Sequence, residues 1–203
     1  MREYSGVTAD SVNNIIDSAG IVYFNVDVES IRTGDVASAL TGATLFGATD
    51  GGNSFNPGRT MRQIEADGLL GPTKGFQRRG EVAPVLTVNG LEITAGNVIK
   101  AIAGATGAAL TGGGMGQEIT GGEVKPESYL DNVALVTYNQ DASGEITPIA
   151  IFVVENALAL DAPEFASADA DEMVLSVDFA GHFDPAKPGE EPWRIFHRDA
   201  IAG

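Results

Sequence analysis

The sequence predicts a mainly β fold in which two antiparallel sheets pack together and one short helix lies beside them. Several segments alternate apolar and polar residues with the period of two that is typical of half-buried strands. Glycine occurs 26 times and proline nine times, often in clusters between these segments, as expected for a chain with many turns. One segment, residues 94–103, instead carries its apolar residues at helical spacing.

The first predicted strand is residues 21–28, which are rich in β-branched and aromatic residues. One side of this strand is wholly apolar and is expected to face the core: Val22, Phe24, Val26 and Val28. Residues 8–20 have the apolar spacing of a short helix, although an arm that orders only on a neighbour fits them equally well. Residues 29–44 are expected to be a connector.

The most distinctive stretch is residues 45–75. A glycine-rich loop at 45–58 opens into an alternating segment at 59–67, and a glycine-proline loop at 68–75 closes it. Glycine permits backbone angles that other residues avoid, and proline fixes one angle. The pattern predicts a strand held in a sheet between two shaped loops, and a long hairpin is the simpler interpretation of the same pattern.

The middle of the chain is expected to contain a strand pair, a helix and a long loop. Residues 76–92 predict the strand pair, which Pro84 interrupts and which the Asn89-Gly90 dipeptide turns. Thr94 is a suitable N-cap for the helix at 94–103. The glycine runs within residues 105–128 indicate a flexible loop.

The last third is β again. Residues 129–139 and 148–160 predict two strands joined as a hairpin. Residues 173–180 and 193–198 predict two further strands. We find no internal repeat and no linker, so we expect one domain over residues 1–203, with an N-terminal arm at 1–19 and flexible loops at 47–58 and 105–128.

Charge narrows the possible partners. The chain has 28 acidic and 12 basic residues, a formal net charge of −16. Affinity for nucleic acid comes from clustered Lys and Arg, so a chain this acidic is not expected to wrap DNA. Solubility alone is an equally good reason for the acidity. The absence of cysteine and of an apolar signal-peptide run near the start predicts folding in a cytosol, and no segment has the apolar length of a membrane span.

The search for catalytic chemistry predicts no enzyme, no metal and no cofactor. There is no cysteine nucleophile and no Gly-x-Ser-x-Gly motif. His182 and Asp184 are possible metal ligands, but a solvated histidine is the simpler interpretation. The carboxylates at 169–172 lack the spacing of a calcium loop. Glu65 and Asp67 lie about 6–7 Å apart along one strand face, and an acidic exposed surface explains them better than acid-base catalysis.

Three short segments carry a resemblance to a known family. They are Phe46-Gly-Ala-Thr-Asp-Gly-Gly52, Arg62-Gln-Ile-Glu-Ala-Asp-Gly68 and Gly71-Pro-Thr-Lys-Gly75. In these segments the chain resembles the major tail proteins, or tail tube proteins, of long-tailed phages. The resemblance runs from about residue 20 to about residue 104 and consists of small residues and loops.

The resemblance implies a virion structural protein. Six copies would form a ring, and stacked rings would form a tube through which genomic DNA is ejected without specific binding. The implied partners are further copies of the chain and other tail proteins such as the tape measure, terminator and baseplate proteins. The implied locations are the virion tail and, during assembly, the host cytoplasm. No membrane is implied.

Two groups of residues follow as candidates for that function. Acidic residues expected to alternate outward on strands are candidates for the lining of the bore: Glu65, Asp67 and Glu155. Ring stacking and contacts between copies are assigned to the loop at 50–59, to the N-terminal arm and to the only basic cluster of the chain, with intrachain ion pairing as an equal alternative for the cluster. The candidates for these contacts are Asp50, Phe55, Arg59, Arg62, Arg78 and Arg79. For Phe55, local packing is an equal alternative to a contact with a neighbour.

Two other functions fit the sequence less well. The first is a soluble β-sandwich that binds glycans through exposed aromatic residues, for which Trp193, Tyr129 and Tyr138 are the candidates. The second is the inner tube of a contractile tail or of a secretion apparatus, which the sequence does not distinguish from a phage tail tube.

Overall fold

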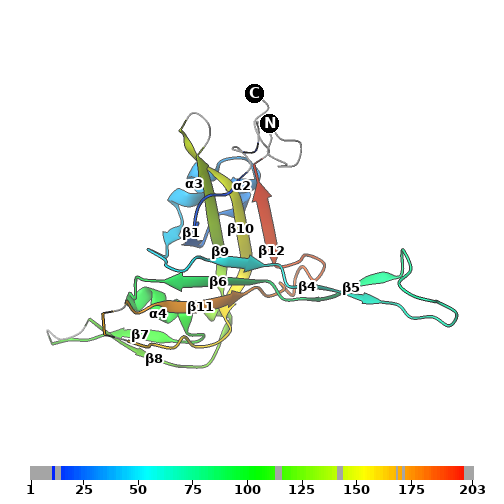
Figure 1. The fold of residues 1–203 in the computed structure, drawn as a ribbon. Coiled ribbons are helices and arrows are strands. Elements are labelled where there is room, and N and C mark those ends of the chain that lie inside the picture. Colours follow the sequence, from blue (N-terminus) through cyan, green and yellow to red (C-terminus); the bar gives the residue numbers. More distant parts are fainter. Residues whose placement is uncertain are drawn as a thin grey trace.

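The fold consists of two antiparallel sheets that share one long strand (Figure 1). The computed structural model describes Ser11 and residues 15–112, 116–140, 144–167, 169–170 and 172–198. Of the arm predicted at 1–19, only Ser11 and residues 15–19 are described. The helix predicted at 8–20 does not extend through residues 15–20, which have no regular secondary structure. The strands of the two sheets cross at a steep angle in Figure 1.

Sheet A contains five strands. Its order is β2 (Thr44–Leu45), β1 (Ile21–Phe24), β9 (Leu130–Gln140), β10 (Ile146–Ala159) and β12 (Trp193–His197). All neighbours are antiparallel. The hairpin predicted in the last third is β9–β10, and its ten paired positions make it the longest ladder of the molecule.

Sheet B contains four strands. The C-terminal end of β10 pairs with β11 (Leu175–Ala180), β11 pairs with β6 (Val85–Gly90), and β6 pairs with β3 (Ser54–Asn56). Strand β10 passes from one sheet to the other next to Asn156, whose φ of +47° lies in the left-handed region that asparagine tolerates. The Asn156 side-chain amide donates a 3.1 Å hydrogen bond to the backbone oxygen of His182, which fixes this bend.

The main core lies between the two sheets. Alternate residues of β6 and β11 point inward, so the apolar side of each strand meets the inner face of sheet A. Phe24 is central, because its ring centroid lies 5.6 Å from that of Phe46 and 5.7 Å from that of Phe179. The largest fully buried residues of this core are Val22, Phe24, Phe46, Leu86, Val88, Val133, Val154, Leu175 and Phe179.

The other face of sheet A is covered by two short helices, α2 (Val28–Arg32) and α3 (Val36–Thr41). The prediction of a connector at 29–44 is therefore wrong. Asp27 and Asp35 cap the helices by accepting backbone N–H groups of the first turn. Hydrogen bonds from serine side chains and backbone amides hold the pKa of both carboxyls below the usual value. Helices of five and six residues are too short for a periodic signal in the sequence to reveal them.

The predicted helix at 94–103 is confirmed as α4 (Ala95–Ala101). The Thr94 hydroxyl accepts a hydrogen bond from the Asn97 backbone N–H at 3.2 Å, as expected of an N-cap. Asn97 is buried, and its side-chain amide donates to the carbonyl oxygens of Phe46 at 2.7 Å and Glu92 at 2.9 Å. Helix α4 is thereby tied to the segment just before it and to the distant segment that follows β2.

A hairpin projects far from the body of the molecule (Figure 1). It is formed by β4 (Arg59–Gln63) and β5 (Gln77–Val82), which pair only with each other in the described structure. The arm continues β3 and β6 outward, and both strand runs are interrupted where it leaves the body, at residues 57–58 and 83–84. The predicted interruption by Pro84 is thus confirmed.

Three details of the middle third differ from the predictions. The strand expected at 59–67 ends at Gln63. The strands within 76–92 are successive parts of one extended run, and the Asn89-Gly90 dipeptide ends β6 without turning the chain onto β5. Within residues 105–128, a second small hairpin forms from β7 (Thr106–Ala109) and β8 (Gln117–Thr120), followed by a 3₁₀ turn at Pro126–Ser128.

The predicted fold class is confirmed in its main terms: the chain is mainly β, with two packed antiparallel sheets and few short helices. The prediction of one flanking helix is an underestimate, since the described residues contain α2 and α3 besides α4. None of the described helices combines the length and the apolar character that crossing a bilayer requires.

Candidate assembly surfaces

One face of sheet B is open to solvent, whereas both faces of sheet A are covered. The exposed face of sheet B consists of the residues that alternate with the core positions on β3, β6 and β11. Most of them are polar, one is a carboxylate, and Val85 and Ala180 are the apolar members: Ser54, Asn56, Val85, Thr87, Asn89, Ser176, Asp178 and Ala180. The Thr87 hydroxyl donates a 2.5 Å hydrogen bond to the Asp178 carboxylate across the strands. This face is therefore mostly polar, with little charge.

Both sheets end in strands that have one neighbour only. In the described structure β12 pairs with β10, β3 pairs with β6, and β2 pairs with β1. A strand edge without a partner leaves backbone N–H and C=O groups that attract another chain. Because β3 and β2 have three and two residues, the five-residue edge of β12 is the longest of the three.

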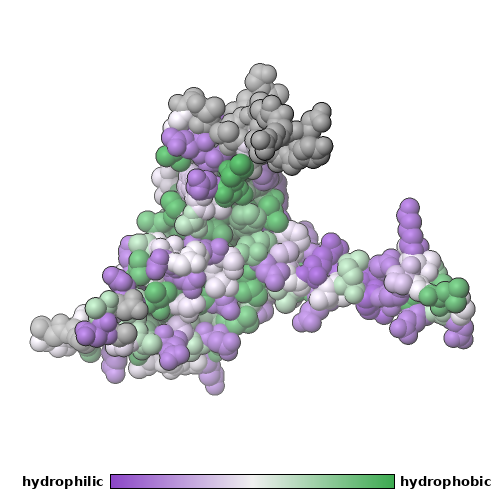
Figure 2. Space-filling model, in the orientation of Figure 1, coloured by the Kyte–Doolittle hydropathy of each residue, from purple (hydrophilic) through white to green (hydrophobic). Residues whose placement is uncertain are grey.

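Most residues of the β4–β5 arm, residues 59–82, are exposed, and Val82 at its base is buried. Four of the five residues of β4 are exposed, including Met61 at 58%. In the loop at the tip, the side chain of Leu70 is fully exposed. Figure 2 shows a mostly hydrophilic arm with a hydrophobic spot near its end. Isolated two-stranded ribbons are marginally stable in water, so an arm of this kind is best explained by a surface that receives it.

The basic cluster predicted for contacts between copies lies on this arm. Arg59, Arg62, Arg78 and Arg79 all belong to β4 or β5. Two of them form ion pairs within the chain, because Glu191 accepts both Arg59 at 3.6 Å and Arg79 at 3.4 Å. This arrangement anchors the base of the arm to the segment before β12.

Phe55 and Asp50, the other two candidates for contacts, differ in position. Phe55 is half-buried, with its ring centroid 5.5 Å from that of Phe152 and 6.3 Å from that of Trp193. It packs inside its own chain, as the local-packing alternative stated. Asp50 is exposed, and its backbone N–H donates a 2.9 Å hydrogen bond to the carbonyl oxygen of Asn89 at the end of β6.

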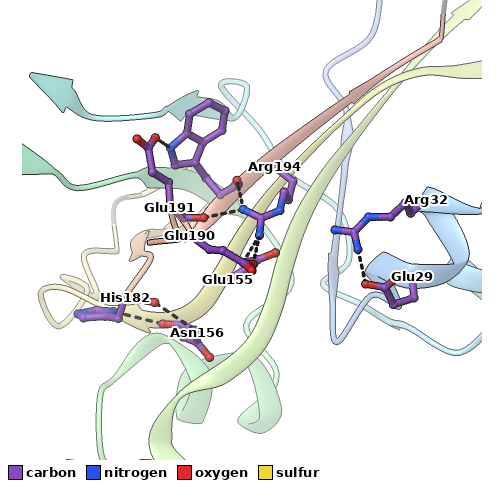
Figure 3. Close-up of polar contacts among 9 residues, drawn as sticks. Glu29, Arg32, Glu155, Asn156, His182, Glu190, Glu191 and Arg194 are labelled. Atoms are coloured by element: carbon purple, nitrogen blue, oxygen red, sulfur yellow. Dashed lines mark hydrogen bonds and ion pairs between the residues drawn. The ribbon is translucent and has the colours of Figure 1, made fainter. Parts of the chain in front are cut away.

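Glu155, a predicted bore residue, lies in a polar cleft of about 650 Å³ (Figure 3). The cleft is formed by α2, β9, β10 and the segment before β12. Glu155 is half-buried, and its carboxylate lies 3.4 Å from the guanidinium of Arg194, which also pairs with Glu190 at 3.1 Å. The expectation that Glu155 points freely outward from a strand is therefore wrong, because the β12 ladder brings Arg194 beside it.

The electrostatics of Glu155 follow from this position. Burial raises the pKa of its carboxyl above the usual value, and the neighbouring Arg194 opposes that shift. A carboxylate held in this way is a structural partner of the arginine and is a poor choice for repelling a passing polyanion.

Glu65 and Asp67 are exposed and lie in the loop at the tip of the arm, beyond the end of β4. Their predicted alternation on a strand is wrong, because pairing with β5 stops at Gln63. Whether they reach a bore depends on how copies assemble, so their role remains a prediction.

The residues considered for metal binding or glycan binding interact with other residues of the same chain. His182 Nδ1 lies 3.2 Å from the carbonyl oxygen of Asn156, and the His182 ring stacks edge-on against Tyr129 at 5.1 Å. Burial, together with a hydrogen bond to Tyr23, raises the pKa of Tyr138 to about 12. In the described ranges no three His, Cys, Asp or Glu residues are grouped in a way that could hold a metal ion.

Comparison with known proteins gives a structural likeness only. No family model matches the sequence, and no curated protein matches it. Among solved structures, the crystal structure of an Hcp protein is similar over 88% of this chain and 98% of that chain, with 10% identity and a TM-score of 0.36. A doubly substituted Hcp1 protein from E. coli EAEC 042 is similar over 87% and 96%, with 9% identity and the same TM-score. At this TM-score the likeness does not establish a common fold, and the function proposed below rests on the surfaces of this chain.

Proposed function

We propose that this protein is the subunit of a hollow tube, the major tail tube protein of a long-tailed phage, in which rings of six copies stack into a conduit for DNA. The observation that carries the proposal is sheet B, which has a dry inner face, a mostly polar outer face and an edge strand with one partner. Such a sheet suits a closed barrel formed by several copies, because closure gives each edge strand a neighbour.

The strand count agrees with a DNA-sized bore. Sheet B contributes four strands, so six copies would contribute 24. With strands ~4.7 Å apart and tilted by about 45°, the backbone circle is roughly 50 Å across. Inward side chains then leave on the order of 40 Å, and a duplex roughly 20 Å wide, judged from its groove depths, passes freely.

In this arrangement the exposed face of sheet B lines the bore. This face carries Asp178 as its one carboxylate, so each ring of six copies places six carboxylates around the bore. The bore is then mildly anionic and rich in hydroxyl and amide groups, which gives DNA no basic surface to bind. Repulsion acts over a Debye length of about 8–10 Å, so only charges on this face affect the DNA.

Negative-stain electron microscopy of the purified protein at high concentration tests the proposal. Tubes or stacked rings with an open centre are expected. A protein that remains monomeric at all concentrations and in the presence of tail-initiation complexes would refute it. The same images distinguish a tube from a glycan-binding monomer.

The chain has no cysteine, so single cysteines report on the bore directly. Ser176→Cys on sheet B is expected to react with a small maleimide in tubes but not with a polymer-linked maleimide too large for the bore. Ala37→Cys, exposed on α3 across sheet A, is the control and should react with both reagents. Equal reaction of both positions with the large reagent would rule out sheet B as the lining.

A further inference from the structure

The β4–β5 arm has the chemistry of a segment that docks on another protein surface. Most of its residues are exposed, and the apolar side chains of Met61 and Leu70 are in contact with water. It also concentrates positive charge in an acidic chain, with five basic residues against three acidic ones. The five basic residues are Arg59, Arg62, Lys74, Arg78 and Arg79.

Only part of this positive charge is used within the chain. Arg59 and Arg79 pair with Glu191 at the base of the arm. Arg62, Lys74 and Arg78 make no ion pair with any residue that the structure describes. These three side chains lie further out along the ribbon and are available to an acidic surface.

A surface of the matching kind lies beside β12, on the face of sheet A that α2 and α3 cover. Two depressions adjoin there, since each is lined by residues of the α2–α3 region and of β12. We call them together the β12 groove. The first, about 650 Å³, has an acidic majority: Asp27, Glu29, Asp131, Glu155, Asp184 and Glu190, against three basic residues.

The second depression of the β12 groove, about 640 Å³, is mainly apolar. Its apolar lining is Ile31, Val36, Pro148, Ile149, Ile195 and Phe196. The groove therefore offers an acidic end and an apolar end.

We propose that the β12 groove receives the β4–β5 arm of a second copy of this chain. In this contact the apolar tip around Leu70 enters the apolar end, and the outer basic residues face the acidic end. The proposal rests on the proposed function, because it specifies how tube subunits hold one another.

The geometry favours a neighbour over the chain's own arm. In Figure 1 the arm extends away from the body, and β12 runs away from the base of the arm in another direction. Each copy thus offers one arm and one groove on different parts of its surface. A contact of this head-to-tail type closes a ring or propagates as an open polymer, which is what a stacked tube requires.

A charge exchange tests the contact in the assembling full chain. The arm variant is Arg62→Glu with Arg78→Glu, and the groove variant is Asp131→Lys with Glu190→Lys. Each is expected to assemble at least tenfold less well than the unaltered chain in sedimentation of tubes. Combining all four substitutions, or mixing the two variants, is expected to restore assembly, because opposite charges face each other again. Glu118→Lys on the β7–β8 hairpin is the control and should leave assembly unchanged.

A disulfide trap gives a second, independent measurement. Leu70→Cys with Val36→Cys is expected to give a ladder of covalently linked copies on oxidation, and Leu70→Cys with Glu118→Cys is expected to give none. Folding of every variant is checked by circular dichroism. Tubes formed normally by the groove variant, or defective variants that neither recombine nor cross-link, would overturn the arm–groove contact while leaving the tube intact. Absence of tubes from the unaltered chain would overturn the tube and the contact together.

Discussion

Leu70 allows the energetic role of the arm to be measured with little interference from folding. Its side chain is fully exposed in the single copy, so Leu70→Ala should change the free energy of unfolding by less than ~0.5 kcal/mol. If the side chain becomes buried in a neighbour, the substitution removes three buried carbons. At about 0.8 kcal/mol for each buried methylene, the loss is roughly 2.4 kcal/mol per contact.

A loss of this size has a large effect on a polymer. At about 1.4 kcal/mol for each tenfold change, the concentration needed for tube growth should rise roughly 50-fold. The assay is the concentration of unassembled protein left after sedimentation of tubes. Leu110→Ala, a partly exposed leucine just beyond β7, is the matched control and should leave that concentration unchanged. An equal concentration for Leu70→Ala and the unaltered chain, with tubes present in both, would refute the burial of this residue between copies.

Three further predictions concern the fold that presents these surfaces. Asn97→Ala leaves the buried carbonyl oxygen of Phe46 without its donor, and chemical denaturation should show a loss of about 1–3 kcal/mol, whereas an unchanged midpoint would contradict the role of this bond. Gly58→Ala places a Cβ against the backbone oxygen of Ala83 at a residue with φ of +56°, so the base of the arm should be distorted and tube assembly reduced; normal tubes with an unchanged melting temperature would count against this reasoning. Burial raises the pKa of the Glu155 carboxyl above the value near 4.5 that it has in the unfolded chain. The carboxyl therefore binds a proton more tightly in the folded state than in the unfolded state. The unaltered chain should therefore lose stability relative to Glu155→Gln as the pH rises from 4.5 through the raised pKa, and parallel stability curves for the two proteins would disprove the shift.

The sequence was a reliable guide where local periodicity decides structure. Val22 and Phe24 were assigned to the core from the alternation of a single strand, and both are fully buried. Thr94 was assigned as an N-cap from its place before an apolar stripe, and its hydroxyl accepts the expected backbone bond. In these cases the residues that determine the outcome lie within a few positions of one another.

The candidate surfaces were predicted less well, because they depend on contacts between distant segments. Glu155 was expected to be free, and Arg194, which is 39 positions away, pairs with it through the β10–β12 ladder. For Phe55, local packing and a contact with a neighbouring copy were equally expected. The positions of Phe152 and Trp193 favour packing within the chain. The β12 groove had no signal in the sequence, since its lining comes from four separate regions.

The amino-acid sequence alone determined the β-rich class of this protein, the buried sides of its main strands, the α4 helix and the excess of negative charge, because each follows from composition or from neighbouring residues. Only the tertiary structure decided that β10 serves two sheets, that the basic cluster stands on a projecting arm, and that one sheet face stays open. The physical reason is that strand partners are chosen by the packing of the whole core, so residues far apart in the chain determine which edges and faces remain for a neighbour.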